Sequence, residues 1–221
     1  MVYQRKSRMT VWQQQKLLEP CVAGPTARAA AMLVGVQANT AIRFYQRLRR
    51  LIASKVERDE LSGEVEADER YFGGGRKGRR GRGAAGNVPV VGLFKRGGKG
   101  STAMIPNAQA STLIPMIREK VLPDSLVETD SFHVDEVLDV SDFHPRRGKH
   151  SHVFVSTRGH HINGIENFWS QAKRHLRRFN GIPQDSFYWL LKECDGRFNG
   201  GGHTALFHQL KAWYRAAINR S

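Results

Sequence analysis

Three acidic residues, far apart in the chain, have the types and spacing that metal-assisted phosphodiester chemistry needs. Asp68 lies in the run EVEADERYFGG, Asp130 ends the run SLVETD, and Glu166 follows after 35 intervening residues. Carboxylate oxygens are the protein ligands that Mg²⁺ prefers, with water and phosphate completing its shell. Two such ions, about 4 Å apart, can activate a water or a 3′-hydroxyl and stabilise the leaving oxygen of an in-line displacement. The three acids therefore predict a two-ion site for Mg²⁺, or Mn²⁺ in its place, that cuts and joins DNA.

Lys173 follows Glu166 by seven positions in the segment NGIENFWSQAKRHLRRF. On a helix these two side chains project within about 20° of each other, and they lie outside the apolar stripe. That separation is too long for a direct ion pair, which favours contact of Lys173 with a phosphate over a plain surface ion pair. Trp169, on the same segment, is expected in the core rather than as a base-stacking wedge. The apolar stripe consists of Ile165, Phe168, Trp169, Ala172 and Leu176.

The elements that must position these acids are short strands and helices. Strand-like runs at 63–74, 87–96 and 101–107 precede a helical run at 110–121 and a strand at 125–130. This order indicates a mixed α/β sheet, and an RNase H-like fold has it, with the first and fourth strands adjacent at its centre. That adjacency would bring Asp68 beside Asp130. Glu66 shares the expected strand face of Asp68 whereas Glu69 points the other way, so these two glutamates are internal controls.

The segment before this sheet predicts a DNA-reading module. Residues 13–24, 26–34 and 38–54 are expected to form helices, with Thr26 as a cap and the turn GVQ between the last two. This is the helix-turn-helix pattern, whose second helix enters the major groove by its N-terminal residues. A three-helix bundle that binds no DNA, or that dimerises, is the alternative. The predicted DNA contacts are Gln37, Asn39, Thr40, Arg43 and Arg47, and the predicted buried face is Ala41, Ile42, Tyr45, Leu48 and Ile52.

The charge of the chain points to an acidic polymer as partner. Lys and Arg outnumber Asp and Glu 35 to 20, giving a formal charge of +15. No run approaches the roughly 20 apolar residues of a membrane span, so double-stranded DNA is favoured over a membrane. The glycine-flanked loop at 73–86 is expected either to grip phosphate or to stay solvated. The basic residues expected on DNA are Arg76, Lys77, Arg79, Arg80 and Arg82 in this loop, with Lys173, Arg174 and Arg177.

These segments suggest a helix-turn-helix domain at 1–55, a linker at 56–63 and a catalytic domain at 64–221 that includes two C-terminal helices. Cys21 and Cys194 have no CxxC partners and are expected to be reduced thiols. The histidines between 131 and 161 match no zinc spacing, so no zinc is expected. The N-terminus lacks a signal-peptide core, which favours the cytoplasm.

Three strings, VEADERYFGG, VETDSF and HHINGIENFWSQAKRHLRRFNGIP, resemble the DDE transposases of bacterial insertion sequences. The resemblance is greatest to the ISXO-like group, insertion-sequence family fifteen-ninety-five, in its ten-sixteen branch. It implies an RNase H-like core, divalent metal and movement of an element bounded by inverted repeats. Asp68 and Asp130 match the first two acids of the family. The third position in that group is an acid or an asparagine, so both Glu166 and Asn163 are candidates, and Glu166 is preferred because a charged oxygen holds Mg²⁺ better than an amide.

On this interpretation Asp68 bridges the two ions, Asp130 and Glu166 each hold one, and Lys173 anchors a phosphate or a terminal base. Pairing of two element ends implies a homodimer or a higher oligomer on DNA. Three alternatives stay open: a nuclease or resolvase of the same fold that does not join DNA, a non-enzymatic helix-turn-helix regulator, and a transposase copy that has lost activity.

Overall fold

The computed structural model describes residues 9–73, 87–129, 144–147, 163–179 and 181–218. The chain divides into two compact units, each described by itself below. We call residues 1–54 with 200–221 the helical unit and residues 55–199 the sheet unit. No helix within the described ranges is both long and apolar enough to cross a bilayer.

The helical unit contains α1 (Val11–Ala23), α2 (Ala27–Val34), most of α3 (Ala38–Val56) and α8 (His203–Ile218). Thr10 and Gln13 form a capping box that starts α1 two residues earlier than the sequence predicts. Thr26 caps α2, as predicted, by accepting a hydrogen bond from the backbone N–H of Ala29. Gly35 then ends α2 with φ of 68°, a left-handed conformation that glycine adopts without strain. The three predicted N-terminal helices are therefore confirmed.

The grouping of α8 differs from the sequence prediction, which placed residues 200–221 with the catalytic domain. In the structure α8 packs within the helical unit. The ring of Tyr214 meets Phe44 edge-on, with 5.4 Å between centroids, and its hydroxyl is hydrogen-bonded to Gln14. Leu206 and Leu210 are buried. The periodicity of α8 indicates that one face must be covered, but contains no information about which distant helices cover it.

The sheet unit is built on five strands in the order β3-β2-β1-β4-β5. They are β1 (Glu64–Phe72), β2 (Val88–Lys95), β3 (Gly100–Met104), β4 (Leu126–Thr129) and β5 (His144–Arg147). Strands β1, β2 and β3 pair antiparallel, whereas β1 with β4 and β4 with β5 pair parallel. The predicted mixed α/β class and the adjacency of the first and fourth strands are confirmed. The edge strand beyond β4 has the polar sequence HPRR.

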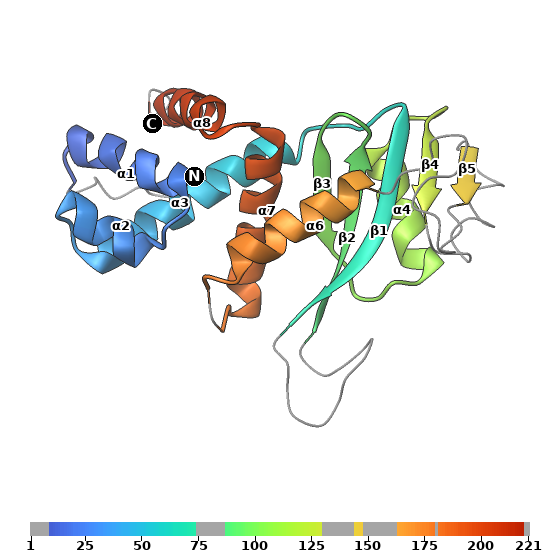
Figure 1. The fold of residues 1–221 in the computed structure, drawn as a ribbon, viewed down its shortest axis with the longest axis horizontal. Coiled ribbons are helices and arrows are strands. Elements are labelled where there is room, and N and C mark those ends of the chain that lie inside the picture. Colours follow the sequence, from blue (N-terminus) through green and yellow to red (C-terminus); the bar gives the residue numbers. More distant parts are fainter. Residues whose placement is uncertain (1–8, 74–86, 130–143, 148–162, 180, 219–221) are drawn as a thin grey trace. The chain divides into compact units, whose positions relative to one another are not determined.

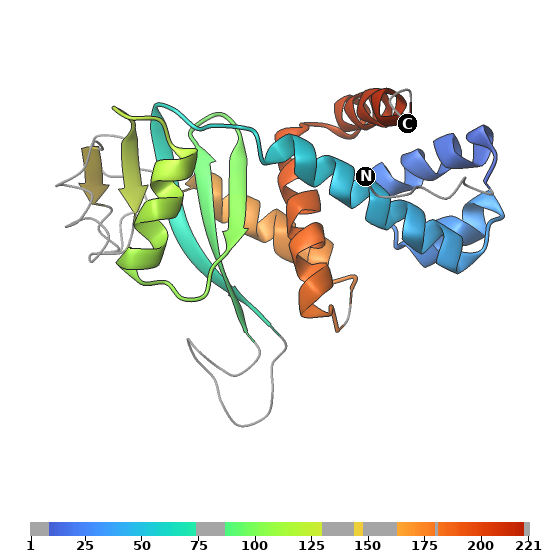
Figure 2. The same cartoon turned by 180° about the vertical axis from the view of Figure 1, so that it is seen from behind.

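Helices cover both faces of this sheet. Figure 1 shows α6 (Asn163–Leu176) in front of the strands, and Figure 2, from behind, shows α4 (Ala110–Lys120) in front. The α4 face buries Val65, Ala67 and Val127 of β1 and β4. The opposite face packs on α6 and α7 (Gln184–Asn199). The predicted stripe of α6 is confirmed, because all five of its residues are buried: Ile165, Phe168, Trp169, Ala172 and Leu176.

The edge strand β3 is closed by side chains of α7. Asn199 accepts a hydrogen bond from the Gly100 N–H (2.8 Å) and donates to the Gly100 carbonyl (2.9 Å). Asp195 accepts from the N–H (3.1 Å) and the hydroxyl (2.8 Å) of Thr102. Lys192 donates to the Thr102 carbonyl (2.6 Å) and to Asp195 (3.2 Å). These contacts take the place of a further strand and block edge-to-edge pairing with another sheet.

Candidate active site and DNA-binding surface

Asp68 lies in the middle of β1, on the sheet face that α6 covers. Its Oδ2 accepts a hydrogen bond of 2.8 Å from the indole N–H of Trp169. Trp169 is 1% exposed and packs against the rings of Phe72 and Phe168, with centroids 5.8 and 5.1 Å away. Trp169 is thus a core residue, as expected from the sequence, but its polar edge also holds the first candidate metal ligand.

Gly92 of β2 makes room for this indole. It pairs with Asp68 in the strand register, and a Cβ at this position would lie 2.6 Å from Cζ2 of Trp169 and 3.1 Å from Cδ1 of Ile165. Carbon atoms do not approach so closely, so any other residue would push the indole away from the sheet. The absence of a side chain at Gly92 therefore allows the hydrogen bond to Asp68.

Gly92→Ala is expected to displace Trp169 and lower the free energy of unfolding by about 1–3 kcal/mol, the usual cost of overpacking a core. Chemical unfolding followed by circular dichroism measures the change. Gly98→Ala is the matched control, because its new methyl would meet only the flexible side chain of Lys95 at 3.1 Å. Equal stability of Gly92→Ala and Gly98→Ala would contradict the tight fit of Trp169 over β2.

A second carboxylate of β1 seats the first turn of α6. Glu66 is 2% exposed, and its Oε2 accepts a hydrogen bond of 2.9 Å from the backbone N–H of Ile165. A carboxylate satisfies the free N–H groups of a helix N-terminus and complements the helix dipole. Gly164 lets this turn approach the sheet, because a Cβ there would collide with the ring of Phe94. The turn that begins at Asn163 and contains Glu166 is therefore fixed directly over the sheet.

Glu66 also belongs to a charged network that joins β1 and β4 through Arg96, the residue after β2. Arg96 contacts Glu64, lies 3.8 Å from Glu66 and donates to Glu128 at 2.7 Å, while Glu66 and Glu128 are register partners. Burial raises the pKa of Glu66, and the charge of Glu128 adds to this, whereas the Ile165 N–H and Arg96 oppose it. Glu66 is thus unsuitable as an inert control. The alternation of side chains along β1 was predicted correctly, but alternation alone does not indicate that α6 covers the face that carries Glu66.

The remaining candidate acids lie on α6 and at the end of β4. Glu166 is exposed in the first turn of α6, three residues before Trp169, and Lys173 is exposed four residues after it, so both occupy turns next to the indole. Asp130 directly follows Thr129, the register partner of Ala67, but Asp130 and the side chain of Asn163 lie outside the described residues. Within the described part of the chain, no three His, Cys, Asp or Glu side chains gather as metal ligands.

The segment predicted as a helix-turn-helix contains α2, the turn at Gly35 and α3. Gln37, Asn39, Arg43 and Arg47 are exposed near the start of α3, and Thr40 is half-buried. Arg47 lies over the ring of Phe44, 5.9 Å from its centroid. Of the predicted buried face, Ala41, Tyr45, Leu48 and Ile52 are buried. Phe44 completes that face, whereas Ile42 is half-buried, because 41, 44, 45, 48 and 52 follow the helical repeat and 42 does not.

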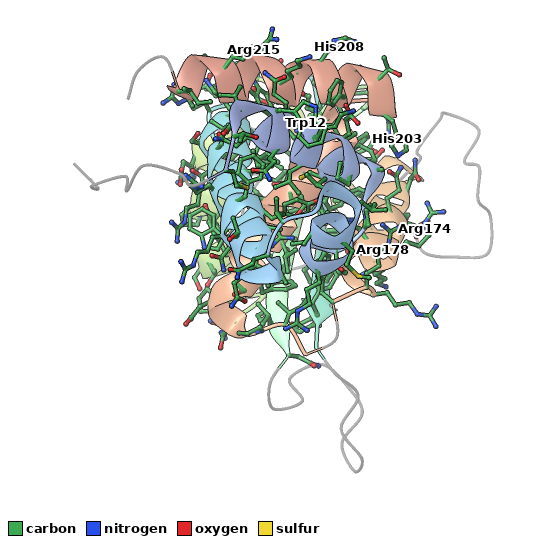
Figure 3. The ribbon with its side chains drawn as sticks, turned by 90° about the vertical axis from the view of Figure 1, so that its left-hand side faces the viewer. Trp12, Arg174, Arg178, His203, His208 and Arg215 are labelled. Atoms are coloured by element: carbon green, nitrogen blue, oxygen red, sulfur yellow. The ribbon has the colours of Figure 1, made fainter. Side chains whose placement is uncertain are left out.

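The other predicted DNA contacts divide into two groups. Lys173, Arg174 and Arg177, at the end of α6 and just beyond it, are exposed, and Figure 3 shows Arg174 directed outward. The basic loop residues Arg76, Lys77, Arg79, Arg80 and Arg82 lie outside the described residues. In the helical unit, Figure 3 shows His208 and Arg215 along the outward side of α8. Cys21 and Cys194 are buried free thiols, as expected.

Sequence reasoning missed the positioning groups Glu66, Gly92 and the Trp169 N–H. One signal was present for the first of them: EVEADE carries acids at every second position, and Glu64, Glu66 and Asp68 therefore share one strand face. Three acids on one face of a strand whose other face is apolar indicate a polar site or network on that side. No sequence pattern indicates that the indole of Trp169 reaches Asp68, because the two residues are 101 positions apart.

Comparison with known proteins identifies the family. Residues 60–199 match the model of the ISXO2-like transposase domain, a range that falls within the sheet unit. A Haemophilus influenzae protein named "Uncharacterized transposase-like protein" is 55% identical over 98 residues, which cover 44% of this chain and 79% of that protein.

Two solved structures resemble the chain only remotely. The Mos1 strand transfer complex aligns with 90% of this chain and 79% of that chain at 13% identity, with a TM-score of 0.25. A pre-cleavage Mos1 transpososome aligns over the same shares at 12% identity, with a TM-score of 0.23. These scores are too low to support an inference, so the assignment depends on the sequence matches. On those matches, the chain belongs to the ISXO2-like family of DDE transposases.

Proposed function

We propose that this protein binds the terminal inverted repeats of an insertion sequence and catalyses metal-dependent cleavage and strand transfer of DNA. The observation that carries the proposal is the placement of Asp68, held by Trp169 against the helix whose first turn contains Glu166. The strand order β3-β2-β1-β4-β5 supports an RNase H-like core, because it sets the strand of Asp68 beside the strand that Asp130 follows.

Asp68, Asp130 and Glu166 would hold two Mg²⁺ or Mn²⁺ ions. The fit is supported by Asp68, a hard oxygen donor that is partly exposed and already oriented by a hydrogen bond, and by the exposed carboxylate of Glu166. Extending the pairing of Ala67 with Thr129 by one residue would set Asp130 opposite Asp68. When bound, divalent ions supply a more acidic water or hydroxyl and stabilise charge on the phosphate oxygens. Asn163 is the neutral alternative as third ligand.

The side chains around this site have distinct proposed tasks. Asp68, Asp130 and Glu166 would together supply the carboxylate ligands of the ions. Lys173, exposed on the same helix as Glu166, holds a DNA phosphate near the reacting bond. Arg174 and Arg177, together with the basic loop at 73–86, neutralise further phosphates without reading sequence.

The helical unit is proposed to recognise the element ends. The left-handed Gly35 between α2 and α3 and the exposed Gln37, Asn39 and Arg43 support insertion of α3 into a major groove. Because two ends must be brought together, the protein acts as a homodimer or higher oligomer on double-stranded DNA. The charge of +15 predicts that binding weakens steeply as salt rises.

Arg43→Ala is expected to weaken binding to the element ends by roughly 5- to 150-fold, the range for one lost base contact of about 1–3 kcal/mol. Binding to a random duplex should change much less. Fluorescence anisotropy with both duplexes over a series of salt concentrations measures the effect. Neutralising Arg79 and Arg80 is the comparison, and it should weaken both duplexes alike and reduce the salt slope by about 2. Equal losses on both duplexes for Arg43→Ala would contradict a base-reading role.

A strand-transfer assay tests the proposed function. It combines the full chain, oligonucleotide duplexes carrying the repeats that flank the encoding element, a supercoiled target, and Mg²⁺ or Mn²⁺. Joined products are the expected result. Cleavage without joining would replace the proposal with a nuclease or resolvase, and specific binding without chemistry under either metal would replace it with a regulator or an inactive copy.

A further inference from the structure

The contact between α6 and β1 is set by two hydrogen bonds with matched spacing. Glu66 and Asp68, two residues apart on one face of β1, bind the Ile165 N–H and the Trp169 indole, four residues apart on α6. Two strand residues span about 6.7 Å, and four helix residues rise about 6 Å. The helix can therefore lie along the strand with both carboxylates engaged at once.

The indole of Trp169 has little freedom to leave Asp68. It is 1% exposed, lies in the space left by Gly92 and contacts the rings of Phe72 and Phe168. A close-packed side chain of this size cannot change rotamer without moving its neighbours. Its hydrogen bond joins an N–H to a carboxylate at 2.8 Å, the short distance of a charge-assisted bond.

The same helix connects Trp169 to the other candidate groups. Glu166 precedes Trp169 by three residues and Lys173 follows it by four, so the three side chains occupy consecutive turns. A hydrogen bond from Trp169 to Asp68 consequently fixes the position of Asp68 relative to both. Without it, α6 would remain tied to β1 at Ile165, but the carboxylate of Asp68 would lose the donor that α6 supplies.

We propose that Trp169 is a positioning residue, whose indole N–H orients the carboxylate of Asp68 for divalent metal and fixes the position of that carboxylate relative to Glu166. This inference rests on the proposed function only in taking Asp68 as a metal ligand. Removing a group that orients a ligand typically lowers metal affinity about 10- to 100-fold. The expected defect is therefore in metal binding, beyond any loss of stability.

A double substitution separates the N–H from the packing. Trp169→Phe removes the donor together with the ring atoms that a methyl at Gly92 would approach most closely, leaving Cδ1 of Ile165 at 3.1 Å, a contact that a shift of a few tenths of an ångström relieves. Gly92→Ala in the same chain refills that space, so the pair Gly92→Ala/Trp169→Phe is expected to be more stable than Trp169→Phe alone while still lacking the donor. If Trp169 only filled space, Gly92→Ala would restore the Mg²⁺ affinity that Trp169→Phe lowers.

The test follows Mg²⁺ titrations of the full chain by ¹H–¹⁵N spectra of the tryptophan indoles. The Trp169 signal is assigned by its absence in Trp169→Phe, and it should move with Mg²⁺ in the parent and not in Asp68→Asn. In the double variant, affinity is read from backbone signals of β1 and should be about 10-fold weaker. Unchanged affinity in the double variant would overturn the proposal, as would a Trp169 signal that ignores both Mg²⁺ and Asp68→Asn.

Strand transfer, measured on the same samples, keeps the two proposals apart. Weaker Mg²⁺ binding by the double variant, with no strand transfer by the parent, would refute the proposed function and retain the role of Trp169. Strand transfer by the parent, with equal Mg²⁺ affinity and equal rates in parent and double variant, would refute the role of Trp169 alone.

Discussion

Asp68→Asn is expected to reduce strand transfer about 1000-fold or more while leaving DNA binding and stability close to those of the parent. Metal ions lower the activation free energy of such reactions by several kcal/mol, and each reduction of about 1.4 kcal/mol raises the rate tenfold. Asparagine keeps the shape of the side chain and an oxygen that can accept from Trp169, but it lacks the charge that holds divalent ions. The measurement is the rate of joined product with end duplexes under Mg²⁺, beside anisotropy with the same duplexes.

Glu69→Gln is the matched control for Asp68→Asn, because Glu69 is the next residue of β1 and the strand alternates its faces. Its strand transfer should stay within a few-fold of the parent. Glu166→Gln and Asn163→Ala then separate the two candidates for the third ligand, since a large loss is expected in the first only. Full activity of Asp68→Asn would remove Asp68 from the proposed site, and a large loss confined to Asn163→Ala would move the third ligand to the start of α6.

Asp195→Ala is expected to lower the free energy of unfolding by about 3–5 kcal/mol, the usual effect of breaking a buried ion pair from one side. Asp195 is fully buried and Lys192 is 3% exposed, so the ammonium group would lose its counter-charge inside the protein. The N–H and hydroxyl of Thr102 would lose their acceptor as well. Denaturant unfolding followed by circular dichroism measures the loss.

Asp185→Ala is the control for Asp195→Ala, because Asp185 is exposed in the first turn of the same helix. Its effect should be about 0.3–1 kcal/mol, the contribution of an acid near a helix N-terminus. Similar effects of the two substitutions would contradict the closure of β3 by α7 that the buried pair provides.

The carboxylate of Asp195 makes the free energy of unfolding depend on pH. Burial raises the pKa of Asp195 from 3.8 to about 6, against the opposing effects of Lys192 and Thr102. Between these values the folded chain holds a proton that the unfolded chain has released, so the free energy of unfolding should fall as pH rises through this window. The parent should lose up to about 3 kcal/mol relative to Asp195→Asn between pH 4 and pH 6. A parent that gains stability relative to Asp195→Asn over this interval would contradict the direction.

Residue type and order were enough to predict the sheet and the candidate acids. The alternation around Asp68 and the apolar run before Asp130 indicated two strands, and the order of elements indicated that these strands are neighbours, which the pairing of Ala67 with Thr129 confirms. The apolar stripe of α6 was also predicted residue by residue, because its period of 3.6 is a local property.

The groups that hold the site together could not be predicted in this way. The bond from Trp169 to Asp68 and the space at Gly92 depend on contacts between segments far apart in sequence. Glu66 shows the same limit. Alternation along β1 predicted the face on which its side chain lies, but its contact with Ile165 depends on how α6 packs on the sheet. The grouping of α8 differs from the prediction for a related reason, since the periodicity of an amphipathic helix does not specify which helices it packs on.

The division of the chain into units makes the sheet unit an insertion. The polypeptide passes out of the helical unit after residue 54, within α3, and re-enters it at residue 200. Both termini belong to the helical unit, so a fusion or fluorescent label at either end would be attached to that unit. One proteolytic cut at either passage would leave the sheet unit covalently attached to one of the two segments of the helical unit, so releasing the sheet unit requires two cuts.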